Sequence, residues 1–501
     1  MIENLISAFF LFATIDSFVA LGIGVFIGVI VGAIPGLTTP MAVALTLPFT
    51  FTLPPVTGIL LLLGVYKGGI YGGSITAILI NAPGTPAASC TVLDGYPMAK
   101  KGEAKRALDI ALYSSCVADF ISNISLILFA GILAGFALKF GPAEVFTLIF
   151  FSLTIISGVS GSQLLKGMAS ACLGLLLATV GMDLIYGTNR FVFGQTNLLA
   201  GLNFIPVLIG LFAIPEILNF FCKKEIKLKK NPLAGVGATL KDFLKCFKTI
   251  VKGSFIGVIL GAIPGIGAAP SAFLSYSEAR RTSKNPENFG KGEIEGVAAA
   301  EAGNNGVAGA TMIPLLALGI PGDIITAIIL GAFMIHGLRP GPLMFTQNIE
   351  LIYAIFMGIM LSSIYLFAIG KASIRFISKI TDIPHRILFP IILVLCIFGS
   401  YAVNNSAFDI SIMFLMGLLG FGMLQLKIPS APFLIAFILG PMLEDSFRQS
   451  LLISGGSYSI FFSTPICWFF WILTVIIISL AAWAYAKSKG TTFLKTNKIV
   501  K

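Results

Sequence analysis

The chain carries the stretch Phe26-Ile-Gly-Val-Ile-Val-Gly-Ala-Ile-Pro-Gly36 twice, the second time as Phe255-Ile-Gly-Val-Ile-Leu-Gly-Ala-Ile-Pro-Gly265. Only Val31 and Leu260 differ between the copies. A second Pro-Gly follows each copy, at Pro83-Gly84 and at Pro321-Gly322. Because glycine and proline are among the matching positions, chance similarity of apolar sequence explains the match poorly. The sequence therefore predicts two related halves, each with two broken segments in the same order.

The composition places both copies in a membrane protein. The 501 residues are 56% hydrophobic and 11% charged, and the mean hydropathy is +0.96. A soluble protein needs far more charge than this to cover its surface. Apolar stretches long enough to cross a bilayer recur from one end of the chain to the other. We therefore predict an all-α, polytopic transmembrane helix bundle, with broken helices or re-entrant hairpins at the Pro-Gly motifs.

Loop charges predict how the two halves are related. The loop between the Pro-Gly motifs is uncharged in the first half (51–55), whereas its counterpart contains Arg280, Arg281, Lys284 and Lys291. After the second motif the bias reverses, and the basic residues are Lys100, Lys101, Lys105 and Arg106 in the first half against Arg339 in the second. Because basic loops face the cytoplasm, corresponding loops are predicted on opposite sides of the membrane. This pattern indicates an inverted-topology repeat, which is common in secondary transporters.

The predicted domains follow from the repeat. Residues 1–222 form the first transmembrane repeat, and residues 253–450 form the second. A lysine-rich linker, 223–252, joins them on the cytoplasmic side, part of it as an amphipathic surface helix. Residues 451–501 supply a final transmembrane helix and a basic cytoplasmic tail. The net charge of +11 lies mostly in short loops, so the predicted partner is the lipid bilayer and not a nucleic acid.

Motifs for other chemistry are missing from the sequence. It contains no G-x-x-x-x-G-K-[ST] phosphate loop, no H-E-x-x-H, no G-x-S-x-G and no Asp-rich metal motif. The two histidines, His336 and His385, are far apart, and the seven cysteines are scattered. We therefore expect no enzyme, no metal site and no tightly bound cofactor. Transport driven by an ion gradient is favoured over an ATP-driven pump.

The first candidate binding segment is Pro35-Gly36-Leu37-Thr38-Thr39-Pro40, with its partner Pro264-Gly265-Ile266-Gly267. Pro-Gly ends one helix, the threonines can cap the next helix, and Pro40 suits the first helical turn. Free N–H groups at the starts of half-helices favour anions, and glycine lets the backbone approach a ligand. A plain kink or surface turn is the alternative. The predicted substrate-binding residues here are Pro35, Gly36, Thr38, Thr39, Gly265 and Gly267.

The second candidate runs from Lys67 through Ser74 and continues as Asn81-Ala-Pro83-Gly84-Thr85-Pro86. Its glycines fit a ligand site and close helix packing equally well. Lys67 lies within an apolar run, where an ionisable group suggests function. It either pairs with a substrate carboxylate or extends to a membrane interface. The predicted substrate-binding residues here are Lys67, Gly72, Gly73, Ser74, Asn81, Gly84 and Thr85.

The corresponding segment of the second half runs from Glu301-Ala-Gly-Asn304-Asn305-Gly306 to Pro321-Gly322-Asp323. Asn304, Asn305 and Gly322 are predicted to bind substrate, and the two asparagines also suit a coupling cation. Asp323 has the position of a helix cap. Alternatively, Asp323 or Glu301 carries a proton or helps to coordinate Na⁺.

Together these motifs resemble a known family. The run Gly68–Ser74, the Asn81-Ala-Pro-Gly84 motif, Asp94-Gly-Tyr-Pro-Met-Ala99 and the Glu301–Asn305 segment are similar to the large membrane subunit of tripartite tricarboxylate transporters, the TctA type. The resemblance extends to about residue 450. Thirteen of the predicted site residues occupy motif positions of that family: Pro35, Gly36, Thr38, Thr39, Gly72, Gly73, Ser74, Asn81, Gly84, Gly265, Gly267, Asn304 and Asn305.

The resemblance implies a multi-pass protein of the bacterial or archaeal inner membrane. It implies uptake of a di- or tricarboxylate such as citrate, driven by Na⁺ or H⁺. It also implies a small TctB-type membrane subunit and a periplasmic TctC-type binding protein as partners. An ion channel or ion exchanger on the same inverted fold is the alternative.

Overall fold

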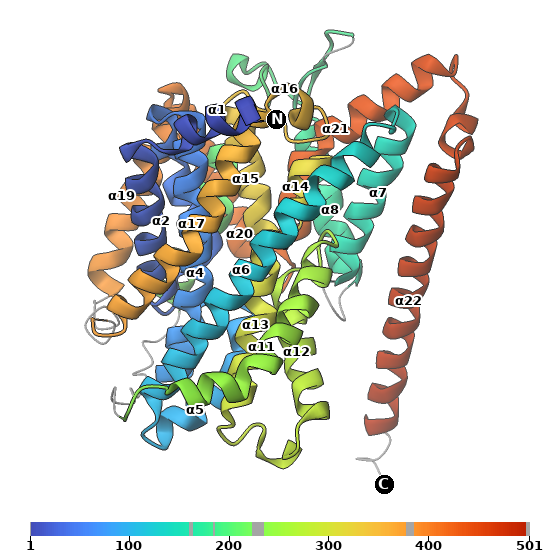
Figure 1. Ribbon diagram of the computed structural model, residues 1–501. Coiled ribbons are helices and arrows are strands. Elements are labelled where there is room, and N and C mark those ends of the chain that lie inside the picture. Colours follow the sequence, from blue (N-terminus) through green and yellow to red (C-terminus); the bar gives the residue numbers. More distant parts are fainter. Residues whose placement is uncertain (1, 160–163, 184–185, 223–234, 377–384, 497–501) are drawn as a thin grey trace. The chain divides into compact units, whose positions relative to one another are not determined.

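The fold is helical, as predicted. The computed structural model describes residues 2–159, 164–183, 186–222, 235–376 and 385–496 (Figure 1). Most of the described residues are helical. Within the described ranges, strand structure is limited to β1 (Gly181–Met182), which pairs antiparallel with β2 (Asn189–Arg190). Eight described helical stretches are long and apolar enough to cross a membrane, which confirms an all-α polytopic bundle.

The chain divides into two compact units, and each unit takes segments from both sequence halves. Unit 1 comprises Met1–Gly135 and Ile205–Phe421, and unit 2 comprises Phe136–Phe204 and Gly422–Lys501. A division of the chain into compact units need not follow its division into sequence repeats. The predicted repeat boundaries therefore stay a prediction.

Unit 1 holds most of the helices. Their bounds in the first half are α1 Ile2–Phe12, α2 Ile15–Gly32, α3 Thr39–Thr46, η1 Leu47–Thr52, α4 Pro55–Ile80, α5 Ala88–Lys100, α6 Ala104–Ala137, α9 Phe204–Phe212 and α10 Ile214–Cys222. In the second half they are α11 Leu240–Gly261, α12 Ala268–Thr282, η4 Pro286–Asn288, α13 Ile294–Ala310, α14 Met312–Leu318, α15 Ile324–Ile335, α16 Met344–Gln347, α17 Ile349–Ser373, α19 His385–Asn404 and α20 Ala407–Gln425.

Unit 2 is smaller. It contains α7 Pro142–Val159, α8 Leu164–Ala178, the β1–β2 ribbon, η3 Thr196–Leu198, α21 Ser430–Ile453, η5 Tyr458–Phe462 and α22 Pro465–Thr496. Helix α22 corresponds to the predicted final transmembrane helix. The last part of the predicted basic tail, 497–501, lies outside the described residues.

The predicted linker between the halves is partly helical. Residues 223–234 lie outside the described residues, and α11 begins at Leu240. Thr239 caps this helix, and its side chain and that of Asp242 bond reciprocally to each other's backbone N–H. The second part of the linker is therefore the start of the helix that carries Phe255–Gly261.

Helices break at each of the four Pro-Gly motifs. Helix α2 ends at Gly32, and α3 begins at Thr39. Helix α11 ends at Gly261, and α12 begins at Ala268. The second motif of each half separates α4 from α5 and α14 from α15. Gly36 and Gly265, the last residues of the repeated stretch, both have a φ of +85°. A positive φ suits glycine, and it occurs at the same point after the helix end in both halves.

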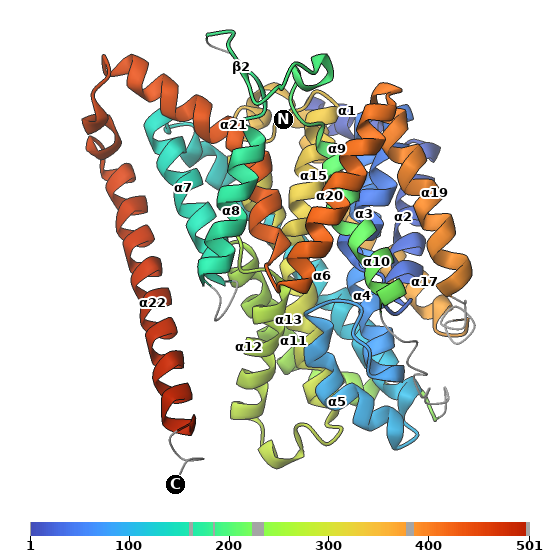
Figure 2. The ribbon, with the colours of Figure 1, turned by 180° about the vertical axis from the view of Figure 1, so that it is seen from behind.

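The corresponding broken segments lie at opposite ends of unit 1. Helix α3 packs beside α15, and α5 packs beside α12. In Figure 2, α3 and α15 are in the upper part of the unit, while α5 and α12 are in the lower part. The first broken segment of one half thus lies beside the second broken segment of the other half. This is the arrangement that an inverted repeat produces.

Glycines let the first two long helices of each half cross closely. A Cβ atom on Gly28 would lie 2.3 Å from the carbonyl oxygen of Val65, and one on Gly68 would lie 2.2 Å from that of Val25. At both glycines the backbones of α2 and α4 therefore lie too close for a larger side chain. At the corresponding crossing of α11 and α13, a Cβ on Gly257 would lie 2.7 Å from the Cα of Gly306. Small residues at helix crossings are a general device of membrane proteins.

Candidate functional site

The two helix breaks of each half meet one another. In the first half, the Gly84 N–H donates to the carbonyl oxygen of Gly73 at 3.2 Å, and a Cβ on Gly84 would lie 2.5 Å from the carbonyl oxygen of Gly32. In the second half, the Gly265 N–H donates to the carbonyl oxygen of Gly322 at 2.7 Å. Pro-Gly motifs far apart in the sequence are therefore neighbours in space.

Polar side chains and glycines shape the ends of the half-helices. Thr38 accepts a hydrogen bond from the Met41 N–H and caps α3, and Asp323 caps α15. Asn81 ends α4 with a φ of +58°, and Gly267 precedes α12 with a φ of +70°. The predicted cap at Asp323 is confirmed. Thr38, as expected of one of the two threonines, also acts as a cap.

Apart from Ser74 Oγ, two buried polar atoms of predicted site residues have no hydrogen-bond partner among the described residues. These atoms are Thr39 Oγ1, in the first turn of α3, and Asn304 Nδ2, in the middle of α13. Thr39 is completely buried, and Asn304 is 1% exposed. Most buried polar groups in native proteins are satisfied, so each exception calls for an explanation. A polar ligand would satisfy both atoms.

Glu301 lies at the centre of a buried polar cluster. Its carboxylate accepts hydrogen bonds from the hydroxyls of Thr91 and Ser115. Asn305 Nδ2 donates to Ser115 Oγ at 2.8 Å and to the Glu301 carbonyl oxygen at 3.1 Å. Ser74 also faces the carboxylate, without a well-aligned hydrogen bond. The structure thus brings Ser74 of the first sequence half beside Glu301 and Asn305 of the second half.

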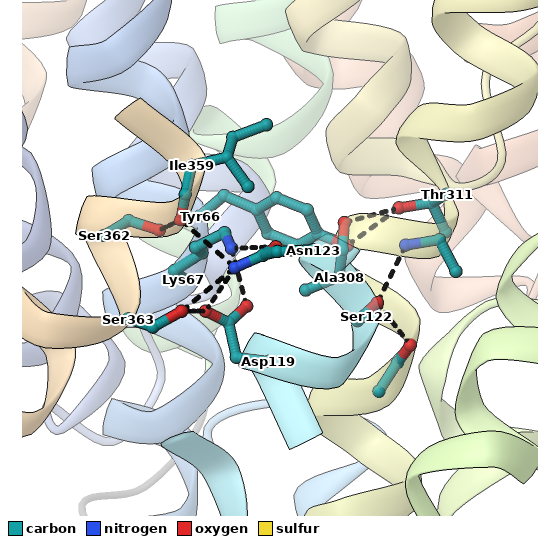
Figure 3. Close-up of polar contacts among 12 residues, drawn as sticks. Tyr66, Lys67, Asp119, Ser122, Asn123, Ala308, Thr311, Ile359, Ser362 and Ser363 are labelled. Carbon is teal, nitrogen blue, oxygen red and sulfur yellow. Dashed lines mark hydrogen bonds and ion pairs between the residues drawn. The ribbon is translucent and has the colours of Figure 1, made fainter. Parts of the chain in front are cut away.

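Lys67 belongs to another buried polar cluster, which Figure 3 shows. Its ammonium group donates to Asp119 Oδ1 at 2.6 Å and to Asn123 Oδ1 at 2.7 Å. Asn123 and Ser363 also bond to the other oxygen of Asp119, so α4, α6 and α17 are tied together. Lys67 is 1% exposed and does not extend to the surface of the chain. Its charge is already paired, so a substrate carboxylate would have to displace Asp119.

Tyr66 links the first half to the second break of the other half. Its hydroxyl donates to Asp323 Oδ2 at 2.9 Å and lies 3.4 Å from Thr311 Oγ1. A Cβ on Gly322 would lie 2.8 Å from the Cβ of Thr311. The start of α15 is therefore held from three sides: by its own cap, by Tyr66 and by Thr311.

Close packing accounts for some of the predicted glycines. A Cβ on Gly72 would lie 2.6 Å from the carbonyl oxygen of Val29, so this residue serves the crossing of α2 and α4. Gly73 instead faces the second break, where a Cβ would lie 3.0 Å from the methyl group of Thr85. Pro35 is partly buried and Gly36 is exposed, and a Cβ on Gly36 would meet no atom within 4 Å.

The sequence interpretation missed the partners on α5 and α6. Thr91, Ser115, Asp119 and Asn123 were not singled out, although three of them occupy one stripe of α6 at intervals of four. The argument that drew attention to Lys67 applies equally to Asp119, because both are ionisable groups within apolar runs. That signal was present in the sequence.

The described residues contain no group of three or more His, Cys, Asp or Glu side chains that could hold a metal ion. Transition metals need such nitrogen, sulfur and carboxylate ligands. The clusters consist mainly of hydroxyls, amides and single carboxylates, which suit anion binding or a light cation better.

Comparison with known proteins gives a consistent result. The family model described as "Tripartite tricarboxylate transporter TctA family" matches residues 18–435. A protein of Agrobacterium vitis, named "Uncharacterized 52.8 kDa protein in TAR-I ttuC' 3'region", is 37% identical over 469 residues, which cover 93% of each chain. A second protein of that organism, "Uncharacterized protein in TAR-II ttuC' 3'region", is 39% identical over 210 residues, covering 42% of this chain and 87% of its own. No solved structure matches.

Proposed function

Because this chain belongs to the tripartite tricarboxylate transporter TctA family, we propose that it imports a di- or tricarboxylate such as citrate by ion-coupled alternating access. The observation that carries the proposal is the pairwise meeting of the helix breaks, together with the unpartnered polar atoms of Thr39 and Asn304. Half-helix N-termini attract anions, and Thr39 and Asn304 supply hydrogen bonds without a permanent charge. The substrate site would lie between these residues and the glycines of the breaks.

Several finer assignments belong to the same proposal. The partners would be a small TctB-type membrane subunit and a periplasmic TctC-type binding protein that delivers the carboxylate. The protein would reside in a bacterial or archaeal inner membrane. The coupling ion would be Na⁺ or H⁺, and Glu301 and Asp323 are the candidates to carry it. Glu301 is the better placed of the two, because Asp323 is occupied by its own helix cap and by Tyr66.

Alternating access requires one part of the molecule to move against another. The four Pro-Gly breaks all lie in unit 1, so the moving block would contain them. Binding of the anion and of the coupling ion would stabilise the same arrangement of the breaks. Lys67 would take part only in a state in which it exchanges Asp119 for a substrate carboxylate.

The test is uptake of labelled citrate into proteoliposomes under an imposed Na⁺ or pH gradient, with a cognate binding protein present. Accumulation against the citrate gradient supports the proposal. An ion channel on the same fold would pass ionic current without accumulating carboxylate, and an ion exchanger would move ions alone. Failure to accumulate any di- or tricarboxylate under either gradient would overturn the proposal.

A further inference from the structure

Glu301 is a buried carboxylate without a cationic partner. The side chain is completely buried in α13, and no lysine or arginine among the described residues forms an ion pair with it. An ionised carboxylate is costly in a low-dielectric interior unless a positive charge accompanies it. The cluster around Glu301 therefore needs either a proton or a cation from outside the chain.

Hydroxyl groups from three helices and the amide nitrogen of Asn305 surround the Glu301 carboxylate. Thr91 of α5 and Ser115 of α6 bond to its two carboxylate oxygens, and Asn305 holds the Ser115 hydroxyl in place. Ser74 of α4 faces the carboxylate but makes no hydrogen bond of good geometry with the described residues. Each hydroxyl has one proton and two lone pairs, so rotation turns its oxygen from donating to the carboxylate to coordinating a cation.

The repeat supplies an independent argument for a cation at this place. Lys67 and Asn305 stand equally far before the second Pro-Gly of their halves, and each precedes a glycine of the helix crossing, Gly68 or Gly306. In the first half, the Lys67 ammonium group occupies a cage of Asp119 and Asn123. The second half has a cage of Glu301 on α13 and Ser115 on α6, with an uncharged Asn305 in place of the lysine. One cage carries its own cation, and the other lacks one.

We propose that Ser74, Thr91, Ser115 and Glu301 form a binding site for Na⁺, and that Asn305, whose amide nitrogen donates to Ser115, holds one of these ligands in place. One carboxylate balances one monovalent charge, whereas Ca²⁺ sites commonly collect several carboxylates and Mg²⁺ sites demand strict octahedral geometry. The hydroxyls that donate to Glu301 stabilise the ionised form of its carboxylate. Protonation would abolish this charged form, whereas Na⁺ would bind to it. This inference rests on the proposed function, since the site would hold the coupling ion.

The site also explains how a cation would influence anion binding. Its ligands come from α4, α5, α6 and α13, and α5 follows the second break of the first half. A bound Na⁺ would hold α5 against α13, the helix that also carries the unpartnered amide of Asn304. Neutralising Glu301 would also remove a negative charge from the neighbourhood in which an anion has to bind. By linkage, the anion must then increase the affinity for Na⁺ by the same factor.

The experiment is Na⁺ binding to the purified protein in detergent, without carboxylate and without a membrane gradient. Thermal stability is measured while NaCl replaces choline chloride at constant ionic strength, and ²²Na⁺ binding is measured directly. We expect saturable stabilisation by Na⁺. Glu301→Gln should raise the half-saturating Na⁺ concentration about tenfold or more, and Thr91→Val and Ser115→Ala should each raise it severalfold. Glu350→Gln, an exposed carboxylate of α17, is the control and should behave as wild type.

Two results would overturn the assignment. One is a wild-type protein that Na⁺ stabilises no more than choline does, with no ²²Na⁺ bound; pH-driven uptake that Glu301→Gln abolishes would then identify Glu301 as a proton carrier. The other is unchanged Na⁺ affinity in Thr91→Val and Ser115→Ala, which decides the matter even where Glu301→Gln fails to fold. Na⁺ binding without carboxylate accumulation would leave the site standing and refute the proposed function instead.

Discussion

The Lys67 ammonium group lies 2.6 Å from Asp119 Oδ1, and both side chains are 1% exposed. Asn123 and Ser363 donate to the remaining oxygen of Asp119, so both carboxylate oxygens have hydrogen-bond partners (Figure 3). A buried pair of this kind costs desolvation, and apolar replacements of both partners are often no less stable. Removing only one partner is different, because it leaves an uncompensated buried charge.

This asymmetry gives a prediction for the pair. Asp119→Ala should lower the free energy of unfolding by about 3–5 kcal/mol, because the lysine charge loses its partner. The double variant Lys67→Met/Asp119→Leu should regain most of that loss. Thermal or denaturant unfolding in detergent, arranged as a double-mutant cycle, measures both effects. Equal destabilisation in the single and the double variant would show that packing, rather than charge, holds α4 to α6.

How far the sequence predicts the fold can be judged from these residues. The membrane bundle and the four helix breaks were predictable, because the lengths of the apolar stretches, the repeated Pro-Gly motifs and the charges of the loops can all be read locally in the sequence. The partner of Lys67 was not, since Asp119 is 52 positions away on another helix. The stripe of Ser115, Asp119 and Asn123 indicates which face of α6 is buried, but which helix that face meets depends on how the helices pack together.

The candidate site shows the same division. Their polar character in the segment before Pro321-Gly322 and the family resemblance singled out Glu301, Asn304 and Asn305, and all three are buried in the structure. Thr91 and Ser115 escaped notice because a single hydroxyl in an apolar run is common and usually bonds to its own helix. Their role becomes visible only when α5 and α6 are brought against α13.

The glycines at the crossing of α2 and α4 give a second prediction. Gly28→Ala should destabilise the protein by about 1–3 kcal/mol, because its Cβ would lie 2.3 Å from the carbonyl oxygen of Val65 and the helices must separate. Gly135→Ala in α6 is the matched control, since a Cβ there meets no atom within 4 Å. That variant should be neutral, or more stable by up to about 1 kcal/mol from helix propensity. Similar thermal unfolding of the two variants would contradict the close crossing.

Asp94 gives a third prediction, because it fixes the loop before α13. Its Oδ1 accepts the backbone N–H groups of Gly290, Gly292 and Glu293 at 2.8–2.9 Å, and its Oδ2 accepts the Tyr276 hydroxyl at 2.8 Å. Asp94→Ala would leave three N–H groups without their acceptor. Because bonds to a charged acceptor contribute about 1.5–3 kcal/mol each, the loss should exceed that of Tyr276→Phe, which removes a single bond.

Hydrogen exchange provides the measurement for Asp94. In Asp94→Ala, the amides of residues 290–293 should exchange at least about tenfold faster than in wild type, whereas in Tyr276→Phe they should stay protected. Equal exchange in all three proteins would mean that the carboxylate does not hold this loop. The motif Asp94–Ala99, singled out in the sequence for its family resemblance, would then lack a structural explanation.

The last prediction separates binding from stability at two asparagines. Asn304 Nδ2 has no partner among the described residues, so Asn304→Ala removes a buried unsatisfied group and should leave the unfolding temperature unchanged or slightly raised. Asn123 Nδ2 donates to Asp119, Ser363 and the Ile359 carbonyl oxygen, so Asn123→Ala should destabilise the protein by about 1–3 kcal/mol. Under the proposed function, Asn304→Ala should nevertheless abolish carboxylate uptake in proteoliposomes. An Asn304→Ala protein that transports at the wild-type rate would place the anion elsewhere, and one that unfolds as readily as Asn123→Ala would make Asn304 a structural residue.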